Sequence, residues 1–135
     1  MNHEESSKSC IPFVQEAIER ATKDKITSIT SCNSKRHYIF VTEKGTSYQM
    51  MFKSEFFNSF GKIFHKVGIG ESVNKDWVEF ALRGKVDYFL FVHSHTIYIC
   101  PVFDFYDYAT TNKTIRTTSD GEITMSVPIT MLKRL

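Results

Sequence analysis

The sequence predicts an α+β fold, with one domain in which a mixed β-sheet is flanked by helices. Its 135 residues, with 41% hydrophobic and 24% charged side chains, have the size and composition of one globular domain. Apolar residues recur with a helical period in some segments and with a strand period in others. A long helical stretch separates two apolar segments, 47–53 and 86–92, and such a crossover allows them to lie parallel.

The N-terminal region is expected to hold a tail and then a helix. Residues 1–8 are polar and are expected to be a disordered or frayed tail, so the domain would span residues 9–135. A helix is predicted over residues 9–22, with Pro12 in the first turn, where a missing N–H does no harm. A weak strand is predicted over residues 26–31.

A β-hairpin is predicted next, from strands at 37–42 and 47–53 around a turn that contains Gly45. Strand side chains alternate between the two faces of a sheet. One face of the second strand would therefore carry Tyr48, Met50 and Phe52, and the other Gln49, Met51 and Lys53.

The crossover is predicted to be helical. Residues 56–67 place their apolar side chains at the spacing of an amphipathic helix. Residues 68–72 are interpreted as a turn between helices, and Ser72 or Asn74 would cap a further helix that runs through Leu82.

The C-terminal half is predicted to add two hairpins around a short helix. Strands at 86–92 and 97–102 flank a turn at 93–96, and the helix covers residues 103–110. Strands at 115–118 and 123–127 then flank a turn with an Asp-Gly pair, which is a strong hairpin signal.

Composition excludes several classes of protein. The net charge of +2 is too small to indicate a partner, but the basic excess lies in the first half of the chain. The three cysteines, Cys10, Cys32 and Cys100, form no Cys-x-x-Cys pair, which favours reduced thiols and a cytoplasmic protein. No apolar run reaches the length of a membrane span, so a membrane partner is not expected.

The order of elements and the motif Met51-Phe52-Lys53 resemble the PD-(D/E)XK nuclease fold, in particular archaeal Holliday-junction resolvases. The similarity covers residues 10–105, with the best match over 77–102. It implies a core of the order α-β-β-β-α-α-β-β, with the C-terminal hairpin as an addition. It also implies an archaeal or viral protein that handles DNA.

The same resemblance implies that the catalytic metal site is missing. Lys53 matches the motif lysine, but Met51 stands at the position of the acid. The expected Asp would lie at His37 or Tyr38. Metal-assisted hydrolysis needs oxygen ligands for a hard cation, and a thioether does not serve. We therefore expect a non-catalytic nucleic-acid-binding protein with no metal or cofactor.

Two alternatives stay open. One is a DNA nuclease that uses Mg²⁺ and atypical acids, namely Glu16, Glu43 and Glu55 together with Lys53. The other is a protein-interaction module or inhibitor, for which the modest net charge is the argument.

Basic residues mark the expected nucleic-acid surface. The candidates are Lys35, Arg36, Lys53, Lys62 and Lys66. DNA is favoured over RNA, and a homodimer is compatible with the sequence. His93 and His95 lack further ligands at a metal-binding spacing, so they are interpreted as part of a surface turn.

Overall fold

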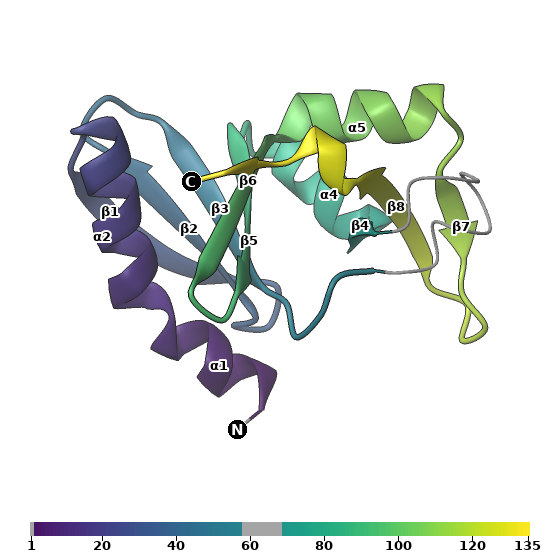
Figure 1. Cartoon of the computed structure of the whole chain (residues 1–135), viewed down its shortest axis with the longest axis horizontal. Helices are drawn as coiled ribbons and strands as arrows, with labels where there is room; N and C mark the ends of the chain where they lie inside the picture. Colours follow the sequence, from purple (N-terminus) through teal and green to yellow (C-terminus); the bar gives the residue numbers. More distant parts are fainter. Residues whose placement is uncertain (1, 58–68) are drawn as a thin grey trace.

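Two β-sheets lie side by side in the computed structural model, which describes residues 2–57 and 69–135 (Figure 1). The larger sheet has six strands in the order β1 (Ile26–Cys32), β2 (His37–Thr42), β3 (Ser47–Phe52), β5 (Tyr88–His93), β6 (Thr96–Pro101) and β9 (Lys133–Arg134). The smaller sheet has three, in the order β4 (Gly70–Asn74), β8 (Ile123–Pro128) and β7 (Ile115–Thr117). The helical elements are α1 (His3–Ser9), α2 (Ile11–Thr22), α4 (Lys75–Arg83), α5 (Val102–Thr111) and the 3₁₀ turn η1 (Ile129–Met131).

The strand pairing confirms the predicted mixed sheet. Strands β1, β2 and β3 form an antiparallel meander, β3 pairs with β5 in parallel, and β5 and β6 form a hairpin. All four predicted central strands therefore share one sheet. Met51 of β3 lies opposite His37 of β2 and Phe91 of β5, which fixes the register at the end of the sheet where the site lies.

Each face of the large sheet has its own hydrophobic core. Helix α2 covers one face, while α4, α5 and the small sheet cover the other (Figure 1). Neighbouring residues of β3 divide between the cores as the alternation predicts, with Met50 under α2 and Met51 on the opposite face. On α5, Phe105 is buried against Phe89, at 5.3 Å between ring centroids.

The N-terminus differs from the prediction, because most of the expected tail forms helix α1. The Asn2 side chain accepts a hydrogen bond from the Glu5 amide at 2.9 Å and caps the helix. Glu4 and Glu5 lie in the first turn, where negative charge is favourable to the helix dipole. Ser7 is buried, and its hydroxyl donates to the Arg36 carbonyl at 2.8 Å, which ties α1 to the turn before β2.

The crossover also differs, because residues 70–74 form strand β4 and not a turn between helices. Strand β4 pairs with β8, more than fifty positions later in the chain, and so turns the C-terminal hairpin into a sheet. Of the two predicted caps, Ser72 and Asn74, it is Asn74 that caps α4, accepting from the Asp76 amide at 2.8 Å. The helix predicted over 56–67 falls almost wholly in the range 58–68, outside the described residues. Phe57, just before that range, forms an isolated β-bridge with Gly70.

In the part of the chain that the structure describes, none of the helices combines the length and the apolar character needed to cross a membrane.

Candidate functional site

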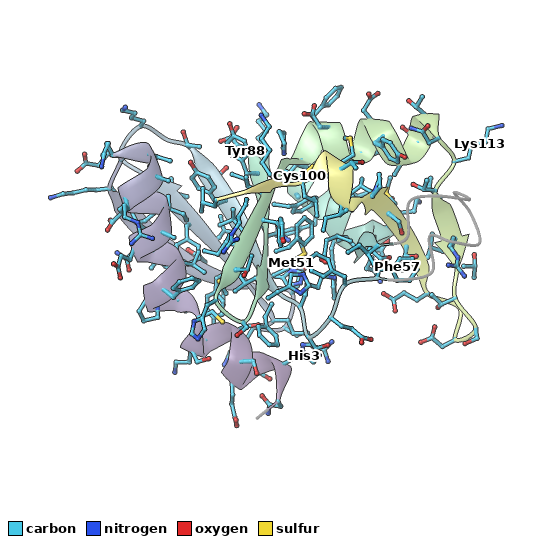
Figure 2. All side chains as sticks on the ribbon, viewed as in Figure 1. His3, Met51, Phe57, Tyr88, Cys100 and Lys113 are labelled. Atoms are coloured by element: carbon cyan, nitrogen blue, oxygen red, sulfur yellow. The ribbon has the colours of Figure 1, made fainter. Side chains whose placement is uncertain are left out.

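A cavity of about 510 Å³ lies where the end of β3 meets the small sheet. Its walls come from α1, the start of β2, the end of β3 with the segment that follows it, β4, α4 and β8. Figure 2 labels three of its lining residues: His3 beside α1, Met51 near the middle of the molecule, and Phe57 toward the small sheet. The cavity therefore draws on residues from His3 to Thr124, and no single sequence segment contains it.

Lys53 connects the two sheets at this cavity. It follows β3 directly, and its Nζ donates to the Ser72 carbonyl of β4 at 2.7 Å. Burial lowers the pKa of this ammonium, and the Glu71 carboxylate acts in the opposite direction. The side chain lies on the same face of β3 as Met51, as the alternation predicted.

Glu71 is the most deeply buried acid at the site, with 1% of its surface exposed. Its Oε1 lies 2.8 Å from Nε2 of His93, and Phe56 stacks on the His93 ring with 4.0 Å between centroids. The second carboxylate oxygen, Oε2, has no hydrogen-bond partner within the described part of the chain. His93 was interpreted as part of a surface turn; this was wrong for its side chain, which is only 12% exposed.

His37 occupies the position opposite Met51 and is held in its neutral form. Its Nδ1 lies 2.7 Å from the Asn33 amide nitrogen and 3.2 Å from the Gln49 amide nitrogen. Both are donors, so Nδ1 is the acceptor in these bonds. Burial, followed by the positive charges of Lys53 and Arg36, lowers the pKa of His37 to about 3.

Two of the predicted basic residues meet at the cavity. Both Arg36 and Lys53 line it. Arg36 precedes β2 and Lys53 follows β3, and the antiparallel pairing of these strands brings the two positions to the same end of the hairpin. Lys35 precedes Arg36 in the same exposed turn. Lys62 and Lys66 lie outside the described residues.

The three acids predicted for the alternative nuclease do not come together. Glu16 is exposed on α2 and pairs with Arg20 at 3.3 Å. Glu43 follows β2, at the opposite end of the hairpin from Lys53, and only Glu55 lines the cavity.

The donor set at the cavity does not fit a Mg²⁺ site. At the end of β3, Met51 offers a thioether and His37 a neutral imidazole whose Nδ1 is already hydrogen-bonded. Among residues 2–57 and 69–135, no group of three or more His, Cys, Asp or Glu side chains is arranged to hold a metal ion.

Sequence reasoning missed Glu71, the one acid that the structure buries beside Lys53. The segment Gly70-Glu71-Ser72 carries almost no strand signal, because glycine and glutamate are both depleted in strands. Only its pairing with β8 makes it a strand and turns the Glu71 side chain inward.

No protein-family model matches the chain. No curated protein matches it either, and neither does any solved structure. The cavity and its residues are therefore the basis for assigning a function.

Proposed function

We propose that this chain is a cytoplasmic nucleic-acid-binding protein that acts without catalysis and binds DNA in preference to RNA. The observation that carries the proposal is the meeting of two cations, Arg36 and Lys53, at one cavity whose walls also hold aromatic side chains. Cations neutralise phosphates, and aromatic rings stack on bases, so this combination is typical of nucleic-acid sites.

The position of the charges supports contact with a phosphate backbone. Arg36 and Lys35 are exposed in the turn before β2, so their side chains can contact the phosphates of a bound nucleic acid without a large rearrangement of the chain. Lys53 lies deeper and is fixed by its bond to Ser72. The exposed pair would supply most of the salt-dependent affinity, while Lys53 would orient the strand that enters the cavity.

The absence of catalysis is proposed from the chemistry of the residues. Hydrolysis of a phosphodiester by the resembled nucleases requires acids that hold a metal ion next to the motif lysine. Here the side chains at the expected positions are the thioether of Met51 and either the phenol of Tyr38 or the imidazole of His37, whose Nδ1 is already hydrogen-bonded. Cleavage of plasmid DNA by the purified wild-type protein with Mg²⁺ would contradict this part of the proposal and favour the nuclease alternative.

A salt titration of binding tests the proposal. Affinity for duplex, single-stranded and branched DNA and for RNA is measured by fluorescence anisotropy over a range of salt concentrations. For the best ligand, Arg36→Ala is expected to lower the log–log salt slope by about one unit, because one phosphate contact is lost. The Arg36 side chain is exposed and its carbonyl remains to accept the Ser7 bond, so folding should be unaffected.

Lys44→Ala is the matched control. It removes one exposed positive charge at the opposite end of the β2–β3 hairpin from the cavity. Its slope should equal that of the wild type. An equal decrease of the salt slope in both variants would mean that binding depends only on the net charge of the protein. If no nucleic acid binds at low salt, the protein-interaction module is favoured instead.

A further inference from the structure

We propose that the cavity takes one unpaired nucleotide whose base carries an exocyclic amino group, so that adenine, cytosine or guanine enters and thymine or uracil does not. This inference rests on the proposed function and specifies the ligand of the same site. It follows from three properties of the cavity: unused acceptors at its base, a mixed charge, and aromatic walls.

The unused polar atoms are Glu71 Oε2, which is an acceptor, and Ser72 Oγ, which can accept or donate. Both residues line the cavity, and both atoms are buried without a hydrogen-bond partner in the described part of the chain. A buried polar atom that has lost water and gained no partner is unfavourable. A ligand that brings a donor to this strand would supply the missing bond, and an ionised carboxylate can only accept.

The charges of the cavity are mixed, which decides how a nucleotide would lie in it. Arg36 and Lys53 line it together with Glu55 and Glu71. A phosphate would be repelled by the buried carboxylate and attracted by the exposed guanidinium of Arg36. The phosphate therefore lies on the Arg36 side and the base on the Glu71 side.

The aromatic walls suit a flat ring. Phe56, Phe57 and Trp77 line the cavity, and its volume of about 510 Å³ is within the range of small-molecule sites. A base removed from a duplex or single strand loses stacking with its neighbours, and contact with these rings would restore it. Trp77 itself lies edge-on to the neutral His37, with ring centroids 4.4 Å apart, so its position is fixed.

The amino group gives the selectivity. Adenine, cytosine and guanine each present an amino group that can donate to Glu71. Thymine and uracil present carbonyl oxygens on both sides of a single N–H, and a carbonyl next to a buried carboxylate is repulsive.

Trp77 is the only tryptophan of the chain, and it lines the cavity, so its fluorescence reports directly on occupancy. We would titrate the full chain with single-stranded oligo-dA, oligo-dC and oligo-dT of about 10 nucleotides at low salt. Oligo-dA and oligo-dC are expected to quench Trp77 and to bind roughly tenfold more tightly than oligo-dT.

Three variants locate the selectivity. Glu71→Gln keeps the shape of the side chain but offers an amide that can donate as well as accept. The preference for oligo-dC over oligo-dT should therefore fall to about twofold or less. Glu55→Gln makes the same chemical change at an exposed carboxylate of the cavity, so it should strengthen all binding and keep the preference. Ser72→Ala removes a hydroxyl that can donate as well as accept, so it should weaken the binding of oligo-dC and oligo-dT alike and leave the preference in place.

The outcomes separate the two proposals. If neither duplex nor single-stranded nucleic acid binds at low salt, the proposed function fails and this inference fails with it. If nucleic acid binds but oligo-dT is bound as tightly as oligo-dC, the proposed function stands and the amino-group site is overturned. An unchanged preference in Glu71→Gln also overturns it.

Discussion

Gln49 and Met50 are neighbours on β3, and both side chains have 0% of their surface exposed, yet they lie in opposite environments. Met50 belongs to the apolar core under α2. Gln49 faces the other side of the sheet, where its amide nitrogen lies 3.2 Å from His37 and its Oε1 has no partner among the described residues. One strand therefore separates a core that is apolar from one that contains buried polar groups.

The difference between the two faces shows which part of the molecule contains groups that reduce its stability. The cavity face buries Gln49, His37 and Glu71, and two of these carry polar atoms without described partners. Such groups lower the free energy of unfolding relative to apolar residues of the same size. Their concentration next to one cavity is what a binding site would produce, because a ligand can complete bonds that the folded chain leaves open.

The largest effect is expected on the apolar side of β3. Met50→Gln would bury an amide where the surrounding cluster is apolar, and should reduce the free energy of unfolding by roughly 3 kcal/mol. Urea unfolding followed by circular dichroism measures this. Phe103→Gln is the control, because Phe103 is 66% exposed and should change stability by about 0.5 kcal/mol or less. Equal effects of the two variants would contradict the assignment of Met50 to a closed core.

A smaller effect is expected from acid on the cavity side. His37 has a pKa lowered from 6.5 to about 3 in the folded chain, so between these values the unfolded chain binds more protons. The stability is therefore complete above the ordinary pKa of histidine and is lost as the pH falls. The loss should be roughly 2 kcal/mol between about pH 8 and about pH 5.

The variant His37→Gln isolates this contribution. Glutamine does not titrate, and its oxygen can accept a bond from Asn33 as Nδ1 does. Unfolding measured at several pH values should show a shallower dependence in the variant over this range. An identical dependence in the two proteins would mean that the pKa of His37 is the same in the folded and the unfolded chain.

The smallest effect is expected from Gln49→Met, the mirror of the first substitution. It removes one bond to His37, which keeps its bond from Asn33, and it also removes a buried oxygen without a described partner. These changes oppose each other, so the free energy of unfolding should change by about 1 kcal/mol or less in either direction. If Gln49→Met lowers the free energy of unfolding as much as Met50→Gln does in the same urea assay, the polar side of β3 is as sensitive to substitution as the apolar side.

The local patterns in the sequence were sufficient to predict the four central strands of the large sheet, but not its edge strand β9. Alternation along β3 placed Met50 and Met51 on opposite faces, and the length of the crossover predicted that β3 and β5 lie parallel. Ser72 and Asn74 were the two candidates for the helix cap from residue type and position, and the structure has Asn74 there. These features depend on neighbours in the chain or on the period of hydrophobic residues, and both can be read from sequence.

The candidate site was predicted only in part. Lys53 and Arg36 were chosen from the sequence as binding residues, and the structure brings both to one cavity. Glu55 was one of three acids considered for a metal, and it alone lies there. Their charges were visible in the sequence, but their proximity depends on the register of β2 against β3 and on the position of the small sheet.

Strand β4 and the burial of Glu71 were decided only by the tertiary structure. The segment Gly70-Glu71-Ser72 has no intrinsic preference for a strand, and the hydrogen bonds that hold it come from β8, far along the chain. That pairing carries Glu71 to His93, and Lys53 of the large sheet then bonds to Ser72. The residue types alone thus set the two faces of the large sheet. The cavity exists because long-range backbone pairing provides bonds that no local sequence pattern encodes.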